Sequence, residues 1–404
     1  MVTALDRSGP TYDPYDPEID DDPYPVWRRL RDEAPLYRND EHDFFALSRW
    51  EDVEPALRDW EAYRSGKGTT LEVIRAVVDN GIELPPGIVL FEDPPIHDLH
   101  RSLLSRVFTP RRMATIEPLV RRYCAAALDP LVGEDELDLV ADFAAFVPMR
   151  TIGFLLGIPE GSQEEIRRRT DERLAIVDGA PSDIDDTTFE VTDDVLSDYI
   201  DWRARHPSDD LMTDLLQAEI EDGGTRRRLT RDEVVTYTRV VAGAGNETAT
   251  RLIGFTVDLL ERHPDQRREV HDDRGLVDRC IEEVLRYEAP SPVQARYVAH
   301  DVDVLGTTIR EGSVVLLLNG AANRDERHFP DAERFDIHRD DGPHLSFGYG
   351  LHYCLGAALA RLEGRVALDE ILRRWPAWTV DRDRGRKAHT ASVRGWETLP
   401  FQPT

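Results

Sequence analysis

Apolar residues recur at every third or fourth position along much of the chain, which is the spacing of helices with one buried face. This pattern predicts helices over residues 25–34, 100–108, 113–132, 231–263, 278–287 and 355–375. Runs typical of strands are fewer and shorter, and they cover residues 43–49, 302–310, 313–319, 378–381 and 398–401. The chain is therefore expected to be mainly α-helical with small β-sheets.

The longest predicted helix has clear signals at its start and in its middle. Thr230 and Glu233 have the spacing of a capping box, in which both side chains accept backbone N–H groups at the helix start. At ~1.5 Å per residue, a helix over residues 231–263 would extend about 50 Å and cross the whole molecule. The glycines of AGAGNETAT, residues 242–250, weaken a helix, so they indicate a packing notch or a place where a flat ligand lies.

Composition limits the cellular setting and the classes of partner. The 404 residues are 40% hydrophobic and contain no internal repeat, which favours one domain spanning residues 1–404. No apolar run approaches the ~18 residues that span a bilayer, and the acidic, proline-rich N-terminus does not resemble a signal peptide. A cytoplasmic protein with no membrane partner is therefore expected. A net charge of −29 argues against nucleic acid as a partner, because phosphate binding needs a basic surface.

The candidate chemistry centres on Cys354 in SFGYGLHYCLG, residues 346–356. A zinc site would need companion ligands in a spacing such as C-x-x-C, and the other cysteines, Cys124 and Cys280, lie at helix-like apolar positions far along the chain. Because a helix is predicted to follow Cys354, the helix dipole is expected to lower the pKa of the thiol and favour the thiolate. A lone thiolate leaves the other coordination positions to a macrocycle, which indicates haem.

The neighbours of Cys354 favour this interpretation. The glycines at 348, 350 and 356 would let the backbone pass close beneath a porphyrin plane, and Phe347 would pack on the macrocycle edge. A cysteine-nucleophile hydrolase, with His352 as the base, is an alternative. That alternative leaves the glycines unexplained.

The segment FGYGLHYCLG matches all six specified positions of the signature F-G-x-G-x-H-x-C-x-G, so the chain resembles the cytochrome P-450 superfamily of the soluble bacterial type. The resemblance implies the cytochrome P-450 fold, with a long central helix over the haem, and heme b (iron protoporphyrin IX) as the cofactor. It also implies that Cys354 is the only protein ligand of the iron. The residues implied to contact the cofactor are His97, Arg101, Ala244, Gly245, Thr248, Arg296, Ser346, Phe347, Gly348, His352, Cys354 and Gly356.

Two further groups of residues follow the order of the family's motifs. The segment DPPIHDLHR, residues 93–101, resembles the stretch that places His97 and Arg101 at the haem propionates, together with Arg296 and His352. Buried carboxylates need such cationic or donor partners. The pair Glu283 and Arg286 resembles the family's E-x-x-R, and the resemblance implies that Arg334 of PDAERFD completes a buried charge network holding the thiolate loop.

The segment AGNET, residues 244–248, is similar to the family's A-G-x-(D/E)-T and implies that Glu247 and Thr248 relay protons during oxygen activation. The implied activity is that of a monooxygenase that inserts one atom of O2 into a hydrophobic small molecule. Electrons are expected from NAD(P)H through a separate ferredoxin and its reductase. The alternatives are a peroxide-driven peroxygenase and a haem-thiolate sensor without turnover, and Glu247 and Thr248 count against both.

The resemblance also places the surfaces that meet substrate and partner. An acidic loop, residues 178–190, is expected to form part of a lid, and the protein is expected to be a monomer. The implied walls of the substrate pocket are Val73, Ile74, Val77, Val78, Ile88, Val241, Ala244, Pro292, Val293, Ser392 and Val393. A basic island for an acidic ferredoxin is expected at Arg106, Arg111, Arg112, Arg361 and Arg365, unless these arginines pair with nearby acids such as Glu363.

Overall fold

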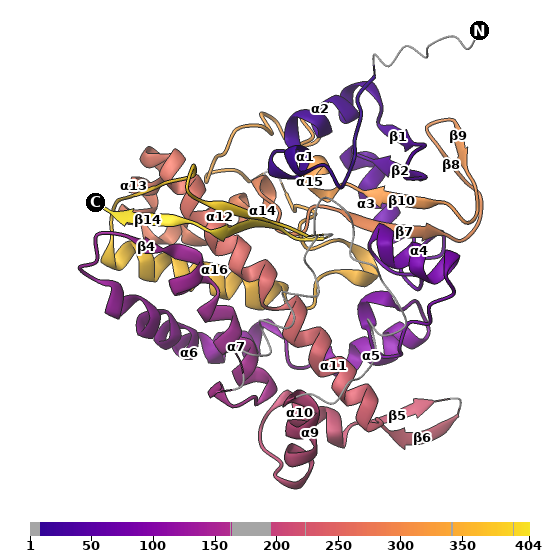
Figure 1. Ribbon diagram of the computed structural model, residues 1–404, viewed down its shortest axis with the longest axis horizontal. Coiled ribbons are helices and arrows are strands. Elements are labelled where there is room, and N and C mark those ends of the chain that lie inside the picture. The colour runs from indigo at the N-terminus through magenta and orange to yellow at the C-terminus, as the bar shows by residue number, and fades with distance from the viewer. Residues whose placement is uncertain (1–8, 162, 164–194, 223, 341, 391) are drawn as a thin grey trace.

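The computed structural model describes residues 9–161, 163, 195–222, 224–340, 342–390 and 392–404, so the predicted lid at 178–190 lies outside the described residues. Helices dominate the described chain, and the largest sheet lies to one side of them (Figure 1). The expectation of a mainly helical chain with small sheets is confirmed. Within the described ranges, no helix combines the length and apolar character needed to cross a membrane.

The helices of the first half are α1 (Pro17–Asp21), α2 (Tyr24–Glu33), α3 (Trp50–Arg58), α4 (Leu71–Asp79), α5 (Ile96–Ser105), α6 (Pro110–Leu128) and α7 (Phe146–Leu156). Those of the second half are α9 (Val195–Arg205), α10 (Leu211–Gln217), α11 (Arg231–Ala244), α12 (Glu247–Arg262), α13 (Pro264–Asp272), α14 (Val277–Tyr287), α15 (Asn319–Ala322) and α16 (Ala357–Arg374). Short 3-10 turns used below are η1 (Val89–Phe91) and η5 (Gly350–His352).

The largest sheet has five strands in the order β1 (Leu36–Asn39), β2 (Phe44–Leu47), β10 (Val314–Leu317), β7 (Gln294–Val298) and β3 (Tyr63–Arg64). Strand β10 runs parallel to β2, and the other pairs are antiparallel. The smaller elements are β4 (Leu137–Asp138), β5 (Glu219–Asp222), β6 (Thr225–Arg228), β8 (Val302–Val304), β9 (Thr307–Ile309), β11 (Trp378–Val380), β12 (Arg386–His389), β13 (Arg394–Thr398) and β14 (Pro400–Pro403). The strands predicted from the alternating pattern are thus present as β2, β8 with β9, β10, β11 and β14.

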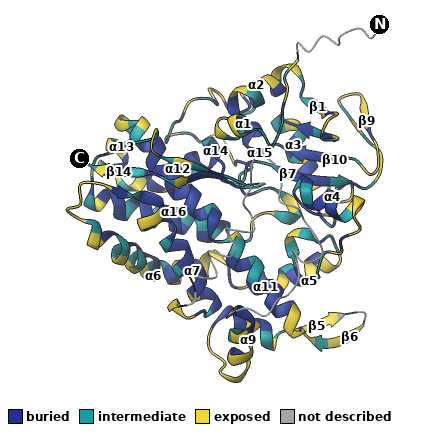
Figure 2. Cartoon of the chain, viewed as in Figure 1, coloured by how far each residue is buried: buried dark blue, intermediate teal, exposed yellow. Residues whose placement is uncertain are grey.

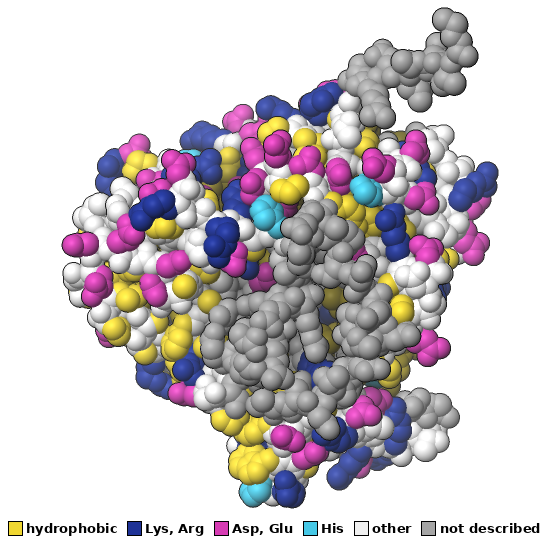
Figure 3. All heavy atoms as spheres, in the orientation of Figure 1, with side chains coloured by type: hydrophobic (Ala, Val, Ile, Leu, Met, Phe, Trp, Pro, Cys, Tyr) yellow, Lys and Arg dark blue, Asp and Glu magenta, His cyan; other side chains and the backbone are white. Residues whose placement is uncertain are grey.

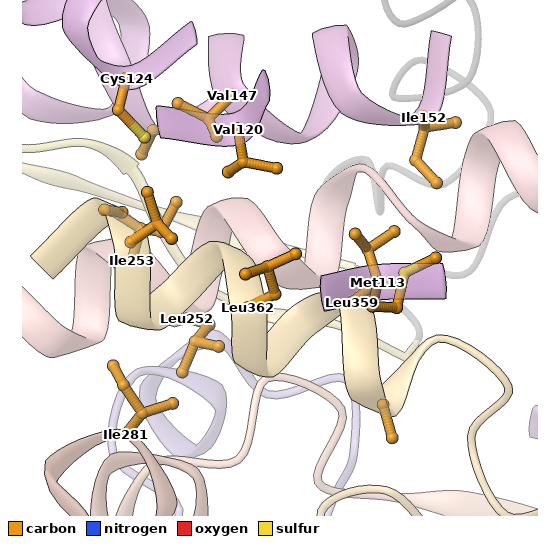
Figure 4. Packing of buried hydrophobic residues seen from close by; sticks show 14 of the residues in the cluster. Met113, Val120, Cys124, Val147, Ile152, Leu252, Ile253, Ile281, Leu359 and Leu362 are labelled. Atoms are coloured by element: carbon orange, nitrogen blue, oxygen red, sulfur yellow. The ribbon is translucent and has the colours of Figure 1, made fainter. Parts of the chain in front are cut away.

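The main core surrounds α16, which packs against α6, α12 and α14. Figure 2 shows α12 and α16 as largely buried helices, whereas the outward faces of α6 and α9 are exposed. In Figure 4, Leu359 and Leu362 lie between the side chains of α6 and α7 above and Ile281 of α14 below. Acidic and basic side chains are interspersed on the face seen in Figure 3, as expected for a surface of many arginine–carboxylate pairs.

The prediction of one continuous helix over 231–263 is wrong, because the chain forms two helices, α11 and α12, with a break at residues 245–246. The predicted capping box is confirmed: the Thr230 hydroxyl accepts from the Glu233 amide at 3.2 Å, and the Glu233 carboxylate accepts from the Thr230 amide at 2.6 Å. A Cβ on Gly245 would stand 2.6 Å from the Ile152 side chain of α7. Close packing with α7 therefore accounts for this glycine, which is the packing notch foreseen as one of the two explanations.

Glu363 of α16 is a buried carboxyl group that forms no ion pair with any described residue. It is therefore not a surface acid paired with the arginines around it, as one expectation had it. Burial raises the pKa of Glu363 to about 8, which is far above the usual value of a glutamate. The folded state thus holds the proton up to a higher pH than the unfolded chain does.

Glu363→Gln is expected to stabilise the protein in alkaline solution and to change little near pH 4.5. The raised pKa means that the wild-type chain loses stability as the pH rises from about 4.5 to about 8, because over this range the unfolded chain releases the proton while the folded chain still holds it. The difference at pH 9 is expected to be on the order of 4 kcal/mol. Urea unfolding midpoints of both proteins from pH 4.5 to pH 9 measure it, and parallel pH profiles would contradict the prediction.

Candidate active site

The loop that carries Cys354 is built from tight turns. The amide of Cys354 donates to the carbonyl of Phe347 at 2.8 Å, and Gly348 and Gly350 have φ angles of +67° and +68°. Only glycine adopts this conformation without strain. A Cβ on Gly350 would also stand 3.1 Å from the backbone of α3, at Arg58. Turn geometry and packing on α3 therefore explain these two glycines.

The thiol of Cys354 is accessible, and the residue lies just before α16, whose N-cap is Gly356. The prediction that the helix start lowers the thiol pKa is wrong in its net direction. Burial by the surrounding protein raises the pKa of Cys354, and the Gly356 amide and the charges of Arg101 and Arg361 offset this only in part. A metal cation at the sulfur would reverse the balance, because a coordinated thiol is deprotonated.

Four basic side chains gather beside this loop from three separate elements. His97 and Arg101 come from α5, Arg296 from β7 and His352 from η5, and the rings of His97 and His352 are 4.6 Å apart. Burial, together with the positive charges of Arg296, His97 and Arg101, lowers the pKa of His352 to about 2. Burial likewise lowers the pKa of Arg296 to about 10. The structure therefore brings the four predicted propionate partners together.

The cationic cluster has the chemistry of a site for carboxylates. The Nε2 atoms of His97 and His352 are buried and have no hydrogen-bond partner within the described part of the chain. Buried imidazole nitrogens without partners are costly, and two arginines stand in the same cluster, so a site of this kind calls for an anionic ligand. Two carboxylates on one ligand edge, beside a cysteine that can coordinate its metal, fit iron protoporphyrin IX.

Accessible side chains form one stripe along α11 and α12. Ala244 is exposed, and Val240 and Thr248, each four residues away, are half-buried. The Thr248 hydroxyl donates to the Ala244 carbonyl at 3.0 Å, across the break between the helices. Because that carbonyl lies at the end of α11, the bond holds the hydroxyl at the stripe.

Glu247 lies beside Thr248 but is buried, with one carboxylate oxygen 3.1 Å from a guanidinium nitrogen of Arg251. Arg251 also donates to the carbonyl of Trp396 in β13. A Cβ on Gly395 would stand 2.7 Å from the Arg251 side chain. Sequence reasoning missed Arg251, although its position four residues after Glu247 on a predicted helix is the spacing of an ion pair.

The predicted Glu283 and Arg286 pair is buried and doubly hydrogen-bonded, at 2.7 and 2.8 Å. The prediction that Arg334 completes this network is wrong, because its side chain is 70% exposed and only its carbonyl faces inward, accepting from Arg286 at 3.2 Å. The additional cation is Arg339, which lies 3.5 Å from Glu283 and is 9% exposed. Sequence reasoning missed Arg339, since nothing in the local pattern shows which arginine of the loop turns inward.

Asn323 connects this charge network to the cysteine loop. Its carbonyl accepts from Arg286 at 2.8 Å, and its side chain bonds the Leu345 amide at 2.7 Å and the Ser346 hydroxyl at 2.8 Å. The Ser346 hydroxyl in turn donates to the carbonyl of Leu285 at 2.6 Å. The network therefore fixes the segment that leads into Cys354.

Some predicted pocket residues belong to the core instead. Val73, Ile74 and Val241 are buried, and the last two belong to hydrophobic clusters of the core. Val78 is instead 46% exposed. The predicted wall residues Pro292, Val293, Ser392 and Val393 do line one cavity. Tyr12 and Trp27 of the N-terminal segment line the same cavity.

Comparisons with known proteins agree with this geometry. The family model for cytochrome P450 matches residues 182–393. Putative cytochrome P450 123 of Mycobacterium tuberculosis is 40% identical over 393 residues, covering 96% of each chain. The chain belongs to the cytochrome P450 family. Another relative, the 6-deoxyerythronolide B hydroxylase of Saccharopolyspora erythraea, is 38% identical over 312 residues, covering 77% of this chain and 76% of the hydroxylase.

The solved structure of cytochrome P450 CYP109Q5 from Chondromyces apiculatus superposes with a TM-score of 0.84 and 32% identity, covering 97% of this P450 and 98% of that chain. The cytochrome P450 fold predicted from the motifs is confirmed. Family membership also makes this chain a haem b enzyme of the monooxygenase class. The individual roles of the site residues remain predictions, which the geometry above supports to different degrees.

Proposed function

We propose that this P450 hydroxylates a hydrophobic small molecule, with Cys354 as the iron ligand and electrons delivered from NAD(P)H by a ferredoxin and its reductase. The observation that carries the proposal is the grouping of one accessible thiol with four basic side chains that include two buried, unpartnered nitrogens. When bound, haem b supplies the oxygen-activation chemistry. His97, Arg101, Arg296 and His352 would hold its carboxylates.

Within this proposal Thr248 and Glu247 have separate tasks. The Thr248 hydroxyl lies on the accessible stripe and can donate or accept a proton there, while Glu247 is an ionisable group one residue away. The contact with Arg251 at 3.1 Å orients the Glu247 carboxylate. A movement of either side chain would connect the hydroxyl to a proton source.

The substrate class is proposed from the apolar wall residues and from the relatives. Val77, Val78, Ile88 and Val293 offer an apolar surface, which favours a hydrophobic ligand. The relative from Saccharopolyspora erythraea is named as the hydroxylase of 6-deoxyerythronolide B. Compounds of macrolactone size therefore belong in the first library, with steroids, terpenoids and fatty acids beside them.

The test combines binding with isotope labelling. Library members that shift the haem from low to high spin are incubated with NAD(P)H, a ferredoxin and its reductase under ¹⁸O₂. One labelled oxygen atom in the product supports the monooxygenase. Product that forms only with hydrogen peroxide would favour the peroxygenase, and tight binding without product would favour a sensor.

We also propose that residues 1–404 act as one P450 domain, in the cytoplasm and as a monomer. The three cysteines are all free, as expected in a reducing compartment. The net charge of −29 favours mutual repulsion between copies.

The proposed docking face for the ferredoxin contains fewer unpaired arginines than the basic island expected from the sequence. Arg361 forms a two-point contact with Glu282 at 2.6 and 2.9 Å, and Arg365 contacts Glu117 at 2.9 Å. These two arginines are therefore largely neutralised. Arg106, Arg111 and Arg112 have no ion pair with any described residue, and they lie around the junction of α5 and α6.

Arg106→Glu and Arg112→Glu are each expected to slow ferredoxin-dependent reduction about fivefold at low salt, because they remove attraction from the docking face. Stopped-flow reduction rates at several ionic strengths measure the effect, which should shrink as salt is added. Arg228→Glu, an exposed arginine of β6, is the matched control. Equal rates and equal salt slopes in all variants would mean that the ferredoxin docks elsewhere.

A further inference from the structure

A buried carboxylate joins the loop before α5 to α5 itself. Glu92 directly follows η1 and is 7% exposed. One of its oxygens accepts from the Gly87 amide at 2.7 Å, and both oxygens lie 2.8 Å from Nδ1 of His100. His100 is 1% exposed and lies on α5, between His97 and Arg101 of the cationic cluster in sequence. Glu92 thus ties the loop to the helix that carries two proposed cofactor contacts.

The same loop is also seated on α11. Gly87 has a φ of +95°, and a Cβ placed there would lie 3.5 Å from Thr236 and 3.6 Å from the ring of Tyr237. The loop therefore runs in close contact with α11 at the point where Glu92 holds its backbone. Ile88 and Leu90 follow Gly87 in the same loop.

His100 reaches α11 directly as well. Its ring meets the ring of Tyr237 edge to face, with centroids 5.4 Å apart and planes at 88°. The carboxylate on Nδ1 fixes the ring orientation and the tautomer, as carboxylates do for histidines at metal sites. Nε2 of His100 and the hydroxyl of Tyr237 are buried and lack a hydrogen-bond partner among the described residues. The Glu92 contact is therefore the polar interaction that the structure shows for the His100 ring within the described residues.

We propose that the Glu92 and His100 pair is a positioning device that holds the loop of residues 82–91 against α11 and so limits the size of the molecules that reach the haem. The proposal rests on the proposed function, because it takes this loop as a wall of the substrate site. It adds two residues that none of the sequence motifs singled out. Both are positioning residues that act through the loop.

His100→Phe is the sharpest variant, because phenylalanine keeps the edge-to-face contact with Tyr237 but cannot bond Glu92. Hydrogen exchange followed by mass spectrometry is expected to be about tenfold faster over residues 84–92 and unchanged in α11. Glu92→Gln retains an acceptor for the Gly87 amide, so a change of less than about twofold is expected. His338→Phe, which removes a surface histidine 2.7 Å from Glu269, is the matched control.

Ligand entry is measured with two haem-coordinating probes of different size, imidazole and clotrimazole. In His100→Phe the association rate of clotrimazole is expected to rise about fivefold, while that of imidazole changes by less than about twofold. Glu92→Gln should retain most of the size discrimination of the wild-type protein. Neither readout requires turnover, so both remain informative if no product of oxygenation is ever found.

The remaining outcomes overturn the proposal. Unchanged exchange over residues 84–92 would show that the pair does not hold the loop. Faster exchange with an equal change for both probes would show that the loop does not select by size. Faster exchange throughout α5, with loss of haem, would reduce the pair to a general role in stability.

Discussion

Cys354→Ser is expected to remove the strongly red-shifted Soret band of the reduced carbon monoxide complex and to reduce turnover on the order of 100-fold or more. A serine hydroxyl does not ionise near neutral pH, so it cannot replace a thiolate that donates electron density to the metal. The loop itself should keep its shape, because its hydrogen bonds at Phe347 and Gly348 come from the backbone. The absorption spectrum of the reduced protein under carbon monoxide measures the change.

Cys124→Ala and Cys280→Ala are the matched controls. Both residues are buried in the main hydrophobic cluster, far along the chain from the cysteine loop, and burial raises the pKa of both thiols. Neither substitution should alter the carbon monoxide spectrum. A red-shifted band in Cys354→Ser, or its loss in either control, would show that another group binds the iron.

Thr248→Ala is expected to lower the yield of product per NAD(P)H about tenfold or more while haem incorporation stays intact. The variant removes the hydroxyl that now donates to the Ala244 carbonyl, and with it the proposed proton donor on the accessible stripe. Electrons that no longer lead to product should leave as hydrogen peroxide. The measurement is product and peroxide formed per NAD(P)H consumed.

Two further threonine variants separate this role from a structural one. Thr248→Ser keeps the hydroxyl and should retain most of the coupling. Thr250→Ala removes a comparable bond, from a buried hydroxyl to the Asn246 carbonyl at 2.9 Å, on the side of α12 that faces the core. Coupling that falls as much in Thr250→Ala as in Thr248→Ala would point to helix stability and against proton relay.

The sequence predicted those parts of the protein that depend on local spacing. Period and capping located the helices, and the signature around Cys354 led to the fold. The break between α11 and α12 escaped prediction, and the close packing of Gly245 at this break against Ile152, a residue far away in the chain, has no signature in the local pattern. The sequence pattern pointed to Arg334, whereas Arg339 is the arginine that faces Glu283. Tertiary contacts decide which side chain of an irregular loop points inward, so the local sequence could not distinguish the two.

Among the charged residues, too, those in local motifs were predicted and those paired over long distances in the chain were not. Motif order identified all four members of the cationic cluster, whereas the ion pairs of Arg361 and Arg365 with Glu282 and Glu117 join separate helices and have no signature in sequence. Glu92 and His100 are eight residues apart in sequence, and this spacing does not indicate a contact. The two residues meet only because the chain turns at the start of α5.

The cationic cluster also links the cofactor to the folding of the chain. Its four members come from α5, β7 and η5, so they meet only when the sheet and the helices are assembled, and their partial burial disfavours positive charge unless an anion lies beside them. Any ligand that binds the folded chain alone stabilises it by mass action. A chain that is made faster than its host supplies haem would therefore spend longer partly unfolded and exposed to proteases. The yield of this enzyme in a foreign cell should then be limited by porphyrin synthesis before it is limited by translation.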